Sequence, residues 1–98
     1  MKKKIYISLP ITGYDIEERK LFAKEAQKTT LKMFPEAEVI TPFDICTEEG
    51  KPYSYYMGKC IEALIECDIV RFEFGWESSK GCMAEFEVAK VYGIKMIL

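Results

Sequence analysis

The chain has 98 residues, a formal net charge of −2 and a hydrophobic fraction of 49%. This length predicts a single domain spanning residues 1–98, because two halves would each be too small to bury a useful core. The composition is that of a folded globular protein, which excludes collagen-like and disordered classes. Acidic residues outnumber basic residues by 16 to 14, so polymeric nucleic acid is not an expected partner.

The available side chains limit the chemistry that the protein can perform. Histidine is absent, so catalysis would have to use carboxylates, tyrosine, lysine or cysteine. The four cysteines lack the CxxC spacing of metal and redox sites, which favours buried free thiols over a metal or disulfide site. Free thiols, together with an N-terminal apolar run too short for a signal peptide, predict a cytoplasmic protein without a membrane partner.

Strand and helix signals alternate from the N-terminus onward. Residues 5–9 are β-branched, aromatic and apolar and stop at Pro10, which predicts a first strand followed by a loop. Asp15 supplies a capping oxygen for the first helix, with Glu18 at capping-box spacing, and the helix should end by Phe34 because a proline follows. Its inward face is expected to carry Phe22, Ala26, Thr30 and Met33.

The remaining elements follow from the same signals. The second helix is expected to bury a face made of Met57, Ile61, Leu64 and Ile65. The predicted order after the first helix is a strand at 39–40, an irregular segment at 43–53, the second helix, a strand at 68–74, a loop at 75–80, a third helix at 81–92 and a strand at 94–98.

This alternation predicts an α/β fold with a doubly wound parallel sheet, four strands in the order 2-1-3-4 and three helices. In that order one helix lies on one face and two lie on the other, so half of the first face lacks a covering helix. Arg71 and Glu73 alternate with apolar residues in the third strand and suit such an open face, which Lys95 could share. Two interpretations are open here, an exposed polar face and a homodimer contact.

A ligand of a doubly wound sheet binds beyond the carboxyl ends of the strands where the order reverses, here between the first and third strands. Two loops lie there, at residues 8–14 and 75–81, and the second leads into a helix N-terminus that can bind an anion. Trp76 could stack on a flat base or pack its loop against the domain. The candidate ligand-binding residues are Ser8, Ile11, Thr12, Gly13, Trp76, Ser78, Ser79 and Gly81.

Glu85 is out of place on its predicted helix. A helical projection puts it within an apolar arc that also contains Cys82, Phe86 and Ala89. A carboxylate on a core-facing stripe is costly unless it is paired, hydrogen-bonded or used by a ligand, although a glutamate at the rim of the core can also reach solvent. Tyr6 on the first strand has a similar ambiguity, because its ring suits a plain core while its hydroxyl still needs a partner.

Three stretches, spread over nearly the whole chain, resemble the nucleoside 2-deoxyribosyltransferase-like family. They are the start Ile5-Tyr6-Ile7-Ser8-Leu9-Pro10-Ile11-Thr12-Gly13, the strand opening Cys67-Asp68-Ile69-Val70, and the pattern Ser79-x-Gly81-x-x-x-Glu85-x-x-x-Ala89. The likeness is greatest to a compact branch with a Gly-Trp-x-x-Ser loop, here residues 75–79.

The resemblance implies a flavodoxin-like homodimer that cleaves the N-glycosidic bond of 2-deoxynucleosides or their 5′-monophosphates. In this interpretation Glu85 is the nucleophile and forms a glycosyl-enzyme intermediate, as in retaining glycosidases. Tyr6 would orient that carboxylate, and Ser79 would help to hold a 5′-phosphate. Water or a free base would accept the sugar, so the protein would act as a hydrolase or a transferase. No metal or organic cofactor is implied.

One position departs from the family pattern. Active members carry an aspartate on the helix before the third strand, where it helps to orient the sugar and protonate the base, and the matching position here is Cys60. Cys60 also flanks the apolar helix face, where a buried thiol is the ordinary interpretation. Asp44 or Glu48 could take the place of the missing acid. The alternative is a non-catalytic nucleotide-binding module. The chain ends at its fourth strand, so C-terminal ligand residues of longer relatives have no expected counterpart.

Overall fold

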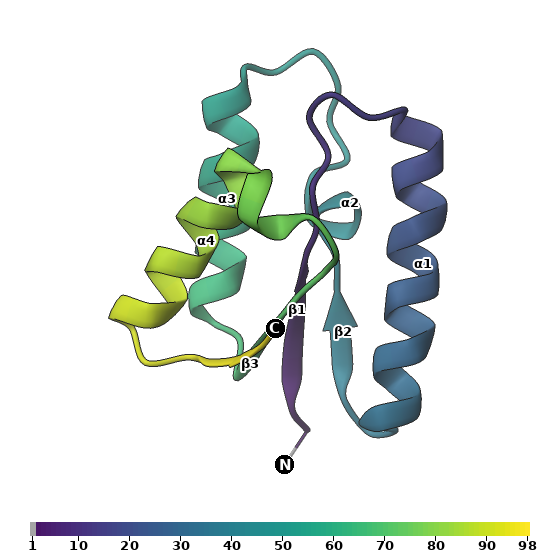
Figure 1. Ribbon diagram of the computed structural model, residues 1–98, viewed down its shortest axis with the longest axis vertical. Coiled ribbons are helices and arrows are strands. Elements are labelled where there is room, and N and C mark those ends of the chain that lie inside the picture. The colour runs from purple at the N-terminus through teal and green to yellow at the C-terminus, as the bar shows by residue number, and fades with distance from the viewer. Residues whose placement is uncertain (1) are drawn as a thin grey trace.

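A four-stranded parallel sheet lies at the centre of the structure, a computed structural model that describes residues 2–98 (Figure 1). The strands are β1 (Lys4–Ser8), β2 (Glu38–Ile40), β3 (Ile69–Phe72) and β4 (Lys95–Ile97). Their order across the sheet is β2-β1-β3-β4, and every neighbouring pair is parallel. The predicted doubly wound fold and strand order are therefore confirmed.

Helices cover the two faces of this sheet unequally. The helix α1 (Ile16–Met33) lies on one face, and α3 (Tyr53–Ile65) and α4 (Lys80–Val91) lie on the other (Figure 1). This arrangement follows from right-handed crossovers in a sheet whose order reverses after β2. Within residues 2–98, no helix combines the length and the apolar character that crossing a membrane would require.

Two short helices were not predicted. The single turn α2 (Pro42–Ile45) lies in a segment expected to be irregular, and the 3₁₀ turn η1 (Trp76–Ser78) lies in the loop after β3. In α2 the backbone N–H and the hydroxyl of Thr41 both donate to Asp44 Oδ2, at 2.9 and 3.1 Å. This local pairing, with Pro42 at the first helical position, is enough to close one turn.

The pleat of β1 divides the core into two layers. Alternate residues of a strand point to opposite faces, so Ile5, Ile7 and Leu9 share one face while Tyr6 and Ser8 share the other. The layer on the α1 side contains Ile7, Leu9, Ala23 and Ala26. The layer under α3 and α4 contains Tyr6, Cys60, Leu64, Cys67, Val70, Phe72 and Ala89.

The buried faces of two helices differ from the predicted ones at their C-terminal ends. Met33 is 51% exposed and Ile65 is 40% exposed, although both were expected to face the core. The buried stripe of α1 consists of Arg19, Ala23, Ala26 and Thr30. Small residues let the helix approach the sheet closely. Met33 lies over the open half of the sheet, where it lines a depression together with Arg71 and Ile97.

The open half of the α1 face also carries charge. Arg71 of β3 donates from Nη1 to Thr30 Oγ1 at 2.8 Å, and its Nε lies 3.2 Å from Glu73 Oε2. The register pairs Ile69 with Lys95, which places Lys95 on this same face, as predicted. A depression remains here, and its lining includes Met33, Arg71, Glu73, Phe74, Ile97 and Leu98.

The N-terminus of α1 allows a first test of the fold. Asp15 Oδ2 accepts a hydrogen bond from the backbone N–H of Glu18 at 2.9 Å, as predicted. The Glu18 carboxylate pairs with Arg19 instead of completing the capping box. Asp15→Ala removes this acceptor and should lower the free energy of unfolding by about 1 kcal/mol, measured by urea denaturation. Thr12→Ala, in the exposed part of the same loop, is the control and should leave the stability unchanged.

Candidate active site

Glu85 of α4 is buried, and both of its carboxylate oxygens accept hydrogen bonds from β1. Tyr6 Oη donates to Oε2 at 2.6 Å, and Ser8 Oγ donates to Oε1 at 2.7 Å. Glu85 is 5% exposed, so of the two interpretations of its position the paired, buried carboxylate is the observed one. It does not reach out to solvent at the rim of the core.

The local sequence explains this geometry. Tyr6 and Ser8 are two residues apart on a strand, so their side chains point to the same face of the sheet. The helix α4 follows β3, the direct neighbour of β1, and packs over that face with Cys82, Glu85 and Ala89 on its buried side. One turn of helix therefore brings a carboxylate over two hydroxyl groups that are held by the central strand.

Burial and hydrogen bonding act on the ionisation of this group in opposite directions. Burial raises the pKa of Glu85 to about 6, and the hydrogen bonds from Tyr6 and Ser8 limit that rise. Burial, followed by the charge of Glu85, raises the pKa of Tyr6 well above its usual value. At neutral pH Glu85 is thus mainly a carboxylate and Tyr6 keeps its proton, which matches the direction of the hydrogen bond between them.

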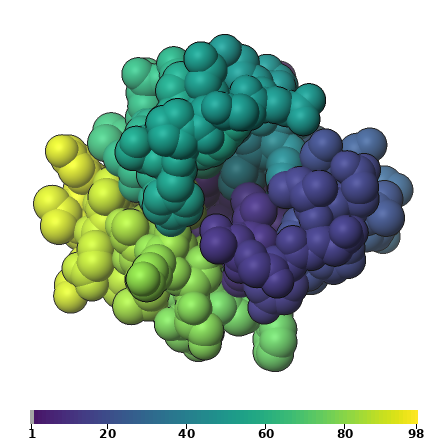
Figure 2. All heavy atoms as spheres, turned by 90° about the horizontal axis from the view of Figure 1, so that it is seen from above, coloured from purple at the N-terminus to yellow at the C-terminus, as the bar shows by residue number. Residues whose placement is uncertain are grey.

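The two predicted loops meet beside this carboxylate. Gly75 has a φ of +87°, and a methyl group at this position would lie 3.6 Å from Pro10 Cγ and 3.9 Å from Tyr14 Oη. Seen from the carboxyl ends of the strands, the surface is hollowed between the loop after β1, the segment leading into α3 and the start of α4 (Figure 2). This is the crevice expected of a doubly wound sheet.

The start of α4 closely approaches the start of α3. Ser79 caps α4, because its Oγ accepts a hydrogen bond from the backbone N–H of Cys82 at 3.2 Å. A methyl group at Gly81 would lie 3.2 Å from Tyr53 Oη and 3.4 Å from Met57 Sδ, so a glycine allows the two helices to come together here. Ser78 lies in the turn before the cap and is exposed.

Several predicted ligand-binding residues have structural contacts instead. The hydroxyl of Ser8 is committed to Glu85. Ile11 packs against the core layer on the α1 side. The Trp76 ring stacks on Phe86 with 5.0 Å between ring centroids and also contacts Phe72, so it packs its loop against the domain. Thr12 and Gly13 are exposed in the first loop.

Tyr53 is a residue at the hollow that the sequence did not indicate. It is the first residue of α3 and is 56% exposed, while its hydroxyl reaches the start of α4. Burial raises its pKa, and the charge of Glu85 raises it further. The preceding proline marks a helix start, but it does not show that this first turn approaches α4.

The structure does not bring a second carboxylate to Glu85 from the predicted positions. Cys60 lies in the core beside Tyr6, and burial raises its pKa to about 12, so it is a neutral thiol. Asp44 is engaged by Thr41 and by Gln27 Nε2, which is 2.9 Å away. Glu48 accepts a hydrogen bond from Tyr55 Oη at 2.5 Å and is exposed.

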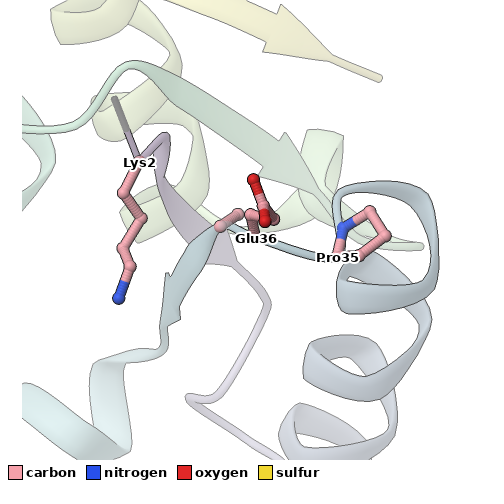
Figure 3. A pocket seen from close by; sticks show the side chains of 4 residues that line it. Lys2, Pro35 and Glu36 are labelled. Carbon is pink, nitrogen blue, oxygen red and sulfur yellow. The ribbon is translucent and has the colours of Figure 1, made fainter.

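Another depression lies at the end of the sheet opposite the hollow. It is lined by Lys2, Pro35, Glu36 and Ala37, near the turn between α1 and β2 (Figure 3). Its lining is exposed or half-buried, and it lacks the buried, hydrogen-bonded carboxylate of the hollow. Across residues 2–98, no three histidine, cysteine, aspartate or glutamate side chains gather as a set of metal ligands.

The fold and the site define a flavodoxin-like α/β protein with a buried carboxylate at the carboxyl edge of its sheet. Residues 3–98 match the sequence profile of a family described as a domain of unknown function (DUF4406), and the chain belongs to that family. None of the curated proteins matches the chain.

Proposed function

We propose that the protein cleaves the N-glycosidic bond of 2-deoxynucleosides or their 5′-monophosphates, through a covalent bond between Glu85 and the anomeric carbon. One observation carries the proposal, the burial of the Glu85 carboxylate with a hydroxyl donor on each oxygen, on the helix whose start borders the hollow. A carboxylate fixed in this way is oriented for attack and is poorly solvated, as a nucleophile in retaining glycoside cleavage needs to be. The resemblance to deoxyribosyltransferases supports the same assignment.

The proposed reaction has two steps. Glu85 attacks C1′, the C1′–N bond breaks, and the base leaves with the bonding electron pair and takes a proton from the Tyr53 hydroxyl. Water or a second base then attacks C1′ from the opposite side, the bond to Glu85 breaks, and the carboxylate is restored. With either acceptor, the proton that water or the second base loses returns to the Tyr53 oxygen. Tyr6 and Ser8 hold the carboxylate throughout.

The surroundings of the hollow suit a small substrate. The N-terminus of α4, with Ser78, Ser79 and Gly81, offers hydroxyl and backbone donors to a sugar or a 5′-phosphate. Thr12 and Gly13 border the substrate from the loop after β1. This reaction needs neither a metal nor an organic cofactor, and we place it in the cytoplasm, which suits a structure whose four cysteines are free thiols.

Cys60 favours one alternative, a nucleotide-binding module that does not turn over its ligand. A neutral, buried thiol cannot replace the hydrogen bonds of an aspartate, and Asp44 and Glu48 are engaged elsewhere. Such a module would still use the hollow and would gain thermal stability when a nucleotide binds. It would release no base.

The test is a direct assay of the purified protein with mixed 2-deoxynucleosides, their 5′-monophosphates and an excess of a foreign base. Chromatography with mass detection should find free or exchanged base. After an acid quench during turnover, the tryptic peptide 81–90 should be heavier by one deoxyribosyl group. Glu87→Gln, on the exposed side of the same helix, is the matched control and should keep the activity. Thermal stabilisation by nucleotides without base release would establish the binding module instead.

We also propose that a second copy of the chain covers the open half of the sheet. Phe74 is 93% exposed and lines the same depression as Arg71 and Glu73, and Lys95 lies on the same face of the sheet. Because this face carries both signs of charge, a two-fold arrangement can place the acid of one copy against a base of the other.

Phe74→Asp should convert the dimer to a monomer, because it puts a charge into an apolar contact. The measurement is the mass in solution by light scattering or sedimentation. Leu21→Asp, at an exposed position on the outer side of α1, is the control and should remain dimeric. A monomeric parent protein at high concentration would contradict the proposal.

A further inference from the structure

Two cysteines from different elements lie close together on the side of the sheet that α3 and α4 cover. Cys46 ends α2 and Cys60 lies in α3, and their Sγ atoms are 3.8 Å apart. A disulfide requires the sulfurs to approach to about 2 Å, which is a small further movement. We propose that Cys46 and Cys60 form an intramolecular disulfide by exchange with a low-molecular-weight disulfide of the glutathione class. This inference does not depend on the proposed reaction.

The surroundings of the two thiols permit this movement and assign them different roles. No helix or strand lies between Cys46 and Pro52, so Cys46 can shift without disturbing the sheet. Cys46 is half-buried and accessible to a small reagent, whereas Cys60 is 5% exposed. Cys46 is therefore the attacking thiol, and Cys60 is the thiol that resolves the mixed disulfide.

The other two cysteines have different contacts. The Cys67 thiol donates to the backbone carbonyl of Ala63 at 3.4 Å, and Cys82 is buried at the start of α4. Neither has a second sulfur within hydrogen-bonding distance among residues 2–98. The pairing should therefore be specific.

The exchange balances in two steps. The Cys46 thiolate attacks one sulfur of the oxidised reagent, whose S–S bond breaks, and one reagent thiol leaves with the electron pair and takes up a proton. The Cys60 thiolate then attacks the Cys46 sulfur of the mixed disulfide, and the second reagent thiol leaves in the same way. The protein loses two electrons and two protons in total, and the reagent is reduced to two thiols.

The new bond would reach the carboxylate site through Tyr6. Cys60 packs in the same layer as Tyr6 and interacts with its hydroxyl, which in turn donates to Glu85. Drawing the Cys60 sulfur towards Cys46 changes the surroundings of that hydroxyl. The bond would also fasten the segment that leads into α3, which borders the hollow.

The experiment treats the folded protein with oxidised glutathione and blocks the remaining thiols with iodoacetamide. The intact protein should lose two hydrogen atoms in mass, and two of the four thiols should become unreactive. Trypsin does not cut between Lys51 and Pro52, so a non-reducing digest should contain peptide 33–59 linked to peptide 60–71. Because the second peptide also contains Cys67, the Cys67→Ser variant should give the same link.

Cys46→Ser and Cys60→Ser should abolish the linked peptide, whereas Cys82→Ser should keep it. If Cys60→Ser fails to fold, the Cys46→Ser variant is sufficient for the test, because Cys46 is half-buried and a serine is tolerated there more easily than in the core. Burial raises the pKa of Cys60 to about 12, so the closing step should become about tenfold faster for each pH unit between 7 and 9. A stable mixed disulfide at Cys46, or a link that involves Cys67 or Cys82, would overturn the proposal.

Discussion

Glu85→Gln is expected to lower kcat/KM by at least about 10³-fold, the scale seen when a covalent nucleophile is removed. Glutamine has the same shape, but its amide does not attack an anomeric carbon. It can accept a hydrogen bond from Tyr6 through its carbonyl and donate one to the Ser8 hydroxyl, so both contacts of the buried site can be kept. The variant should therefore fold and still bind ligand.

Three measurements distinguish loss of chemistry from loss of structure. Initial rates of base release give the change in kcat/KM, circular dichroism checks the fold, and the thermal shift with nucleotide checks binding. Glu87→Gln removes a carboxylate from the exposed side of the same helix and should retain full activity. A Glu85→Gln protein that keeps more than about a tenth of the parent rate would exclude Glu85 as the nucleophile.

The pH dependence of both activity and stability should report the ionisation of Glu85. In the proposed reaction Glu85 has to be ionised to attack, and its pKa is raised to about 6, so kcat/KM should fall about tenfold for each pH unit below that value. Tyr6→Phe removes a hydrogen bond that favours the charged form. It should therefore move the midpoint of this profile to higher pH.

The effect on stability has a definite sign. The folded protein holds the Glu85 proton more tightly than the unfolded chain, whose reference pKa is 4.5. The stabilisation of the fold by protonated Glu85 is therefore fully present below pH 4.5. It is lost as the pH rises towards 6, which lowers the free energy of unfolding by about 2 kcal/mol in total. In the Glu85→Gln variant this part of the pH dependence should be absent, because glutamine does not titrate.

Urea denaturation of the parent and Glu85→Gln proteins at about pH 4 and pH 7.5 gives the required comparison. Other titrating groups, including Glu73, whose pKa is also raised by burial, act equally in both proteins and cancel in the difference. Glu87→Gln should reproduce the pH dependence of the parent. Equal pH dependence in the parent and Glu85→Gln proteins would show that the Glu85 pKa is not raised.

Local patterns were sufficient for the fold and for the centre of the site. The alternation of strands and helices predicted the sheet order, and the helical projection marked Glu85 because a carboxylate interrupted an apolar arc. The pleat of β1 put Tyr6 and Ser8 on one face, but the sequence could not show that Ser8 also donates a hydrogen bond to Glu85. That contact spans 77 positions and depends on how α4 packs over β1.

Other features could not be predicted from local patterns, because they depend on contacts between elements that are far apart in the sequence. Tyr53 belongs to the site only because α3 and α4 approach at Gly81, and the packing of Trp76 depends on Phe72 and Phe86 from two different elements. The ends of α1 and α3 continued the periodicity, but Met33 borders the open half of the sheet and Ile65 is 40% exposed. Periodicity describes one face of a helix and does not tell how far the neighbouring layer extends.

The carboxylate and the border of its hollow belong to separate parts of the chain. Glu85 and its two donors lie on α4 and the central strand, whereas part of the hollow is bordered by the irregular stretch between Cys46 and Pro52. Insertions or deletions in that stretch would leave the strand and helix that hold the carboxylate in place. The same buried carboxylate can therefore be combined with hollows of different size, and one scaffold can change the shape of its hollow by exchanging a single surface segment.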